Sequence, residues 1–101
     1  MDRTARALRT ILTPDQLSRI KPDAFTGRGY TVDVHGLTRR KAERLLKNII
    51  LAAREPITLR VIHGFHKGTV LKEAMRESFC DKIERSEPVE WNRGQTWLYS
   101  K

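Results

Sequence analysis

Residues 30–35 (YTVDVH) alternate between apolar and polar side chains. A period of two is typical of a strand that buries one face, so this segment predicts a half-buried strand. The tyrosine and the two valines would lie on the buried side. Asp33 and His35 would then lie together on the polar side, which places a carboxylate beside an imidazole.

The following segment has the period of a helix. From Ala42 onward, apolar residues recur at spacings of three and four, which gives a single apolar stripe. Gly36 ends the strand, Thr38 can cap the first turn of the helix, and Pro56 cannot continue it. The apolar stripe consists of Ala42, Leu45, Leu46, Ile49, Ile50 and Ala53. We therefore predict an amphipathic helix between Thr38 and Pro56.

Residues 57–63 (ITLRVIH) are rich in β-branched side chains and predict a second, largely apolar strand. A strand, a helix and a strand in this order predict a βαβ unit with parallel strands. We expect a loop over residues 64–68 and then a second amphipathic helix, with Thr69 as its cap. The apolar stripe of that helix would contain Leu71, Ala74, Met75 and Phe79.

The end of the chain predicts a hairpin. Val89–Trp91 and Thr96–Tyr99 are short strand-like runs, and Asn92–Gln95 between them contains a glycine that suits a tight turn. The complete order is then β-α-β-α-β-β. We expect an α+β domain, an α/β sandwich in which two helices pack on a four-stranded mixed sheet.

Residues 1–28 differ from the rest of the chain, because they mix arginines with short apolar spacings and end in the turn-rich stretch KPDAFTGRG. Thr13–Gln16 (TPDQ) has the features of a capping box, so a short helix from about residue 14 to residue 20 is expected. We assign residues 1–28 to a partly helical N-terminal arm and residues 29–101 to one domain. The arm either packs against the domain or extends from it as a basic tail.

The composition points to a polyanionic partner. The formal net charge of the 101 residues is +8 at pH 7, which favours nucleic acid through counterion release. The chain has no apolar run long enough to span a membrane, and its start lacks the pattern of a signal peptide. We therefore expect a cytoplasmic protein, and one domain without a leftover apolar helix face suggests a monomer. Cys80 is the single cysteine, and we expect it beside the buried stripe of the second helix.

Two motifs contain the candidate chemistry, residues 32–38 (VDVHGLT) and residues 61–77 (VIHGFHKGTVLKEAMRE). Each one lies where a predicted strand ends and a helix begins. In open α/β sheets the loops that follow parallel strands converge at one edge, and ligands bind there. The two motifs are therefore expected to be neighbours in space.

Residues 30–100 resemble the small MutS-related (Smr) domain. The family's leucine-aspartate-x-histidine-glycine motif stands here as residues 32–36, with valine in the place of leucine. The family's second motif is matched by His63, Gly64, Gly68, Leu71 and Lys72. Many members have a further glycine where this chain has His66. The resemblance implies a fold like the C-terminal domain of translation initiation factor three. It also implies nicking or cleavage of DNA or RNA, as in members that cleave messenger RNA on stalled ribosomes.

The second motif also predicts a phosphate contact. Gly68 and Thr69 would lie at a helix N-terminus, where free N–H groups and the helix dipole attract phosphate, and basic residues gather at both helix starts. Such contacts position a nucleic acid without reading its sequence. The predicted contact residues are Gly36, Arg39, Arg40, Gly64, Phe65, His66, Lys67, Gly68, Thr69 and Lys72. The alternative is that Gly68 only makes a turn, that the lysines are solvated, and that Phe65 packs under its own loop.

Asp33, His35 and His63 are the candidate catalytic residues. Asp33 would orient or ionise His35, and His63 or His66 would complete an acid and base pair for phosphodiester cleavage. Alternatively, Asp33 caps the amides of its own loop and His63 is a hydrogen-bonded histidine at a strand end. The same four residues lack diagnostic spacing for a metal site, so we expect no cofactor, with a divalent cation as the minor alternative.

Three hypotheses follow from the sequence. The first is a nucleic-acid-binding Smr domain with endonuclease activity on DNA or RNA. The second is a binding module without catalysis that recognises structured RNA, the ribosome or branched DNA. The third is a protein-interaction domain whose charge serves solubility. The sequence does not distinguish DNA from RNA as the target.

Overall fold

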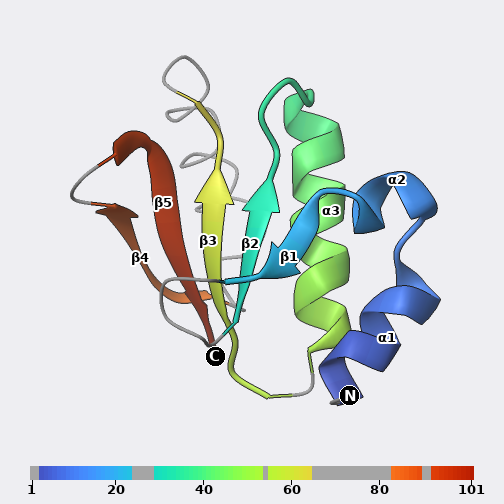
Figure 1. Ribbon diagram of the computed structural model, residues 1–101. Coiled ribbons are helices and arrows are strands. Elements are labelled where there is room, and N and C mark those ends of the chain that lie inside the picture. The colour runs from blue at the N-terminus through green and yellow to red at the C-terminus, as the bar shows by residue number, and fades with distance from the viewer. Residues whose placement is uncertain (1–2, 24–28, 54, 65–82, 90–91) are drawn as a thin grey trace.

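A mixed sheet forms the centre of the molecule. The computed structural model describes residues 3–23, 29–53, 55–64, 83–89 and 92–101, and within them five strands lie in the order β1-β2-β3-β5-β4 (Figure 1). The elements are α1 (Arg3–Ile11), α2 (Pro14–Leu17), β1 (Ile20–Pro22), β2 (Tyr30–Asp33), α3 (Arg39–Ala52), β3 (Thr58–Ile62), β4 (Ile83–Val89) and β5 (Asn92–Ser100). The described part of the chain is therefore a small α+β domain, as the sequence predicts.

The predicted βαβ unit is present as β2, α3 and β3. The two strands are adjacent and parallel, with Asp33 opposite Ile62. The hydroxyl oxygen of Thr38 accepts a hydrogen bond from the Lys41 backbone N–H, which confirms Thr38 as the N-cap of α3. The helix ends before Pro56, as predicted. Ala53, which was predicted to lie on the buried stripe, is instead the C-cap of the helix, and Ala52 is the buried alanine at this end.

The core lies between α3 and one face of the sheet. The strands contribute Val32, Val34, Leu59, Val61 and Leu98 to it, and α3 contributes Ala42, Leu45, Leu46, Ile49 and Ala52. The alternation predicted for residues 30–35 is confirmed, because Val32 and Val34 are buried while Asp33 and His35 are not. This burial fixes which side chains of each strand point away from α3.

The N-terminal arm packs against the domain over residues 3–23. Leu8 and Leu12 are buried in the same core cluster as the residues of α3. The capping box at Thr13 is confirmed, since its hydroxyl accepts from the Gln16 N–H and the Gln16 side chain accepts from the Thr13 N–H. Of the two alternatives, a packed arm is therefore correct for these residues.

The arm also adds a strand that the sequence does not predict. The short helix was expected to reach about residue 20, with a turn-rich stretch from Lys21, but α2 ends at Leu17. Residues 20–22 instead form β1 and pair antiparallel with β2, with Ile20 opposite Val32. The sheet thus has five described strands where four were expected. A three-residue strand gives almost no periodic signal, and Pro22 is tolerated because β1 lies at the edge of the sheet.

The predicted position of the final turn is wrong. Asn92–Gln95 is not the turn but the first part of β5, and Val89 pairs with Asn92. β4 therefore ends at Val89 and β5 begins at Asn92. Gly94 lies within a strand, where its carbonyl oxygen accepts the backbone N–H groups of His63 (2.9 Å) and Gly64 (3.0 Å). A glycine inside a strand often marks such a close approach of two backbones.

The second predicted helix, with Thr69 and Cys80, lies outside the described residues. In the part of the chain that is described, no helix is long and apolar enough to cross a membrane.

Candidate nucleic-acid interface

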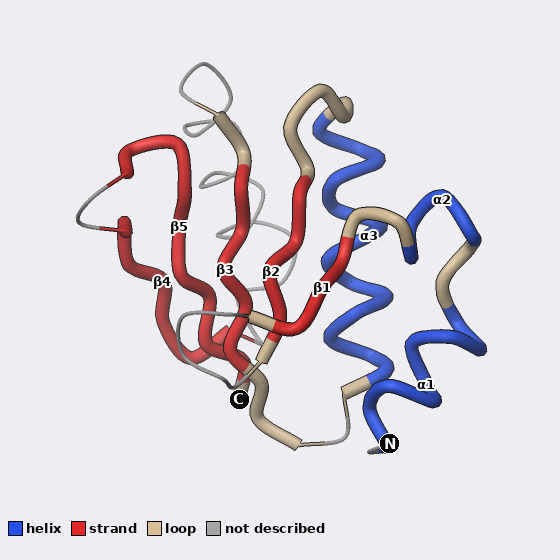
Figure 2. The backbone as a smooth tube through the Cα atoms, viewed as in Figure 1, coloured by secondary structure: helices blue, strands red, loops and turns tan. Residues whose placement is uncertain are grey.

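The two motifs begin at the same edge of the sheet. Because β2 and β3 are parallel and in register, the loops that follow Asp33 and Ile62 leave the sheet at the same end (Figure 2). The backbone N–H of Val34 donates to the carbonyl oxygen of Ile62 across 2.9 Å, so the two chains are still paired as they leave. The expectation of a common edge is therefore confirmed for the described starts of both motifs.

The glycine that follows each histidine is required by its backbone angle. Gly36 has φ of 80° and Gly64 has φ of 79°, in the left-handed region that other residues rarely adopt. A β-carbon at either position would meet no described residue within 4 Å. Both glycines are thus needed for the turn out of the strand because of their backbone angle and not because of crowding by described neighbours.

Asp33 and His35 lie together, as predicted. The Asp33 Oδ1 atom accepts the backbone N–H of His35 (3.0 Å) and lies 3.4 Å from His35 Nδ1. The Asp33 side chain is 45% exposed and that of His35 is 73% exposed. Asp33 therefore caps an amide of its own loop, which is the alternative to a catalytic role. It also lies beside the His35 imidazole, which is exposed to a ligand.

His63 is held in a structural position. It is 4% exposed, its Nδ1 lies 2.7 Å from the carbonyl oxygen of Gly64, and its Nε2 lies 2.8 Å from the Thr96 hydroxyl. A carbonyl only accepts, so Nδ1 donates, and Nε2 of the neutral ring then accepts from the hydroxyl. Both ring nitrogens are satisfied, which matches the alternative of a hydrogen-bonded histidine at a strand end.

The structure does not bring His63 to the other two catalytic candidates. Its imidazole lies on the side of the sheet that carries Val61 and Thr96, which are buried and in register. Asp33 is in register with Ile62, and consecutive strand residues point to opposite faces. Of the three candidates, only Asp33 and His35 therefore share a surface.

Arg19 contacts the candidate site, and sequence reasoning missed it. Its Nη1 donates to the carbonyl oxygens of Asp33 (3.3 Å) and His35 (3.4 Å), and its own carbonyl oxygen accepts the Asp33 N–H (2.8 Å). The arm thus holds the backbone of the first motif in place. The sequence offered no signal for this contact, because it depends on the pairing of β1 with β2.

Basic residues surround the start of α3. Arg39 forms an ion pair with Glu43 (2.8 Å), whereas Arg40 and Lys41 are exposed. The first turn of α3 contains no acidic residue, although acidic residues stabilise this end of a helix. The N-terminus of α3 therefore presents positive charge at the same end of the molecule as the two motifs (Figure 1).

The predicted contact residues are only partly placed. Gly36, Arg39, Arg40 and Gly64 lie at the common edge. The others are outside the described residues, namely Phe65, His66, Lys67, Gly68, Thr69 and Lys72. Among the residues with described positions, no three side chains of His, Cys, Asp or Glu come together as a metal site.

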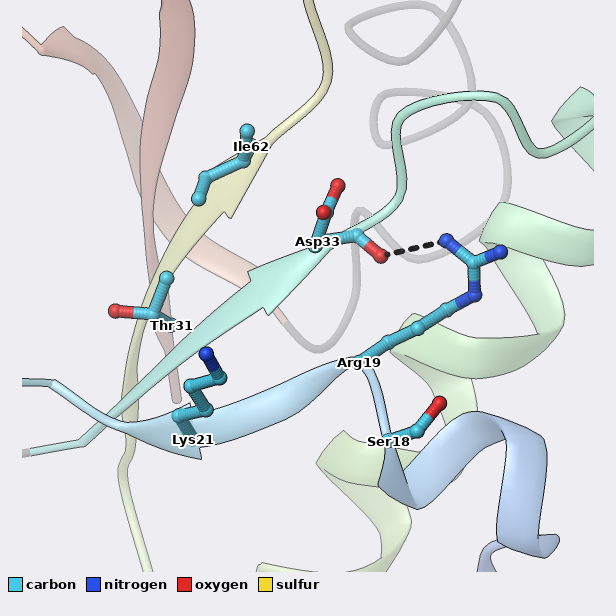
Figure 3. A pocket seen from close by; sticks show the side chains of 6 residues that line it. All are labelled: Ser18, Arg19, Lys21, Thr31, Asp33 and Ile62. Carbon is cyan, nitrogen blue, oxygen red and sulfur yellow. Dashed lines mark hydrogen bonds between the residues drawn. The ribbon is translucent and has the colours of Figure 1, made fainter.

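A cavity of about 180 Å³ opens beside Asp33, on the face of the sheet away from α3 (Figure 3). It is lined by Ser18, Arg19, Lys21, Thr31, Asp33 and Ile62. The arm supplies the first three of these residues, and β2 and β3 supply the others. The arm therefore contributes directly to the surface next to the first motif.

Comparison with known families and with curated proteins found no match to this sequence.

Proposed function

We propose that this chain is an Smr-type domain that binds nucleic acid through its phosphate backbone, at the edge where β2 and β3 end. The observation that carries the proposal is that the described starts of the two motifs lie side by side at this edge, beside the exposed Asp33 and His35. The order β2-α3-β3 followed by an antiparallel hairpin agrees with the initiation-factor-three type of fold that the resemblance implies.

The electrostatics support a polyanion at this edge. The N-terminus of α3 carries the positive end of the helix dipole, and Arg40 and Lys41 in its first turn are exposed. Backbone N–H groups and cations at such a position bind phosphate regardless of base sequence. The net charge of +8 adds long-range attraction that salt screens.

Binding and its salt dependence test this proposal. We expect single-stranded RNA and DNA to bind, and the logarithm of the association constant to fall linearly with the logarithm of the salt concentration. The slope should be about −0.7 for each phosphate that the protein neutralises. Arg40→Gln should weaken binding to every sequence by about fivefold, roughly 1 kcal/mol, and reduce the magnitude of the slope by about 0.7. Fluorescence anisotropy of labelled oligonucleotides measures both quantities.

Lys101→Gln is the matched control, because Lys101 is exposed at the C-terminus, at the opposite end of β5 from the motif edge (Figure 1). It removes the same charge away from the proposed contact. Equal losses for the two variants would show that only net charge matters, and no binding at low salt would refute the proposal.

Phosphodiester cleavage is a second candidate function, favoured by the exposed pair of Asp33 and His35. His35, oriented by Asp33, would remove the proton from a ribose 2′-hydroxyl, which then attacks the adjacent phosphorus. The bond to the 5′-oxygen breaks, leaving a cyclic phosphate and a 5′-hydroxyl that takes up a proton. The buried and hydrogen-bonded His63 is not available as the partner acid, and this favours the binding module without catalysis.

Cleavage is tested with end-labelled RNA and DNA, single-stranded, duplex and branched, with and without chelator. Were the chain a nuclease, His35→Ala would slow cleavage at least tenfold while binding stays within about twofold. Cleavage that persists in this variant would exclude His35 as the base. Binding without any cleavage would identify the non-catalytic module.

A further inference from the structure

The cavity beside Asp33 contains cationic groups that are weakly neutralised by the protein. The Nε atom of Arg19 is buried and has no hydrogen-bond partner among the described residues. Its nearest carboxylate oxygen belongs to Asp15, at 3.9 Å, and the Asp15 side chain is 80% exposed. Asp15 therefore neutralises the guanidinium only weakly, and the guanidinium can still attract another anion.

Lys21 supplies a second cation from the same strand. Its side chain is exposed, and within the described ranges it forms no ion pair or hydrogen bond. Its amino group turns toward β2 along the wall of the cavity (Figure 3). Arg19 and Lys21 both line this cavity, and cationic side chains that line one cavity attract a phosphate group.

Asp33 adds an acceptor to the same cavity. Its Oδ1 is used by His35, but Oδ2 has no hydrogen-bond donor in the part of the chain that the structure describes. A carboxylate repels phosphate, so its presence in the cavity favours a ligand that also carries a hydroxyl donor. The anion and the donor must be a few ångströms apart in that ligand.

The walls of the cavity are held in place before any ligand binds. The Thr31 hydroxyl donates to Asp23 (2.9 Å) and accepts from Arg60 (3.1 Å), and Arg60 donates to Gln95 (2.7 Å). Ile62 adds an apolar surface. The volume of about 180 Å³ is below the roughly 300 Å³ at which cavities for drug-sized ligands begin, so it suits one sugar and phosphate rather than a whole nucleotide.

We propose that β1 completes a pocket for one ribose-phosphate unit of an RNA strand. Arg19 and Lys21 bind the phosphate, and Asp33 Oδ2 accepts a hydrogen bond from the ribose 2′-hydroxyl. The inference rests on the proposed function and deepens it, because it names RNA over DNA and assigns the discrimination to one carboxylate. The 2′-hydroxyl is the group by which a protein distinguishes the two nucleic acids.

The test compares three single strands of the same sequence: RNA, DNA, and RNA methylated at each 2′-oxygen, which cannot donate. We expect RNA to bind about tenfold more tightly than the other two, the size expected for a hydrogen bond to a charged group. Lys21→Gln should weaken all three by about fivefold and leave their ratio unchanged, because phosphate is common to them. Lys101→Gln is again the matched control, with a smaller loss.

Asp33→Asn is the decisive variant. The asparagine keeps an oxygen to accept the His35 N–H, so the loop is retained, but it replaces Oδ2 with a group that cannot accept. The Asn Nδ2 can still donate to the 2′-oxygen, but a neutral hydrogen bond is weaker than one to a carboxylate, so RNA should lose most of its preference while DNA binds as well as before or better. Thermal melting checks the fold. Tight binding with no RNA preference, or a preference that Asp33→Asn leaves undiminished, overturns this inference and leaves the proposed function intact. No binding of any strand overturns both.

Discussion

Gly29→Ala is expected to destabilise the fold by about 3 kcal/mol. Gly29 has φ of 70°, where an alanine is strained, and its added β-carbon would clash with the carbonyl oxygen of Thr58. That oxygen belongs to the backbone of β3 and cannot rotate away. Relief of the clash therefore requires β2 or β3 to shift, which disturbs the parallel pair on which the motif edge is built.

Urea denaturation of this variant measures the loss, and Gly36→Ala is its matched control. Gly36 has a similar φ of 80°, but a β-carbon there would meet no atom within 4 Å in the described ranges of the chain. The control variant bears only the backbone strain, which costs about 1 to 2 kcal/mol. If the two alanine variants lose the same stability, the close contact between Gly29 and Thr58 does not exist.

Asp23→Ala is the second change with a large expected effect, a loss of about 3 kcal/mol. The Asp23 side chain is 1% exposed, and its Oδ1 accepts from Arg60 Nε (3.1 Å) and from the Thr31 hydroxyl (2.9 Å). Arg60 is 8% exposed. Removal of the carboxylate takes away the charge of Asp23 and the hydrogen bond that it accepts from the buried guanidinium, and breaking one side of a buried ion pair costs more than the pair itself contributes.

Two further variants separate this explanation from a general loss of contacts. Asp15→Ala removes an exposed partner 3.9 Å from Arg19 and should change stability by less than about 0.5 kcal/mol. The double variant Asp23→Leu with Arg60→Met removes both charges and should be more stable than Asp23→Ala alone. A double variant as unstable as the single one would mean that the buried charge is not the cause.

Local sequence patterns were sufficient to predict the βαβ unit and the placement of Asp33 beside His35. The period of two at residues 30–35 and the helical stripe of α3 predict their own burial, because each reflects one buried face of a regular element. The same alternation placed Asp33 and His35 side by side. The rule that parallel strands end at one edge then predicted that the two motifs meet.

Contacts between distant segments decided the rest. Nothing within residues 20–22 indicates a strand, because β1 exists only through its pairing with β2. The final turn was misplaced because Gly94 reads locally as a turn residue, whereas its carbonyl oxygen is needed by His63 and Gly64. The energy of pairing between two strands depends on both segments, so the pattern of one segment alone does not predict it.

The sequence by itself determined the class of the fold, the parallel strand pair, the capped helix between them and the excess of positive charge. Only the tertiary structure decided that His63 faces away from Asp33, because the register of β3 against β2 and β5 sets that direction. It also decided that Arg19 and Lys21 of the arm stand beside Asp33. The physical reason is that local periodicity fixes which face a residue occupies, whereas its neighbours across the sheet depend on long-range pairing.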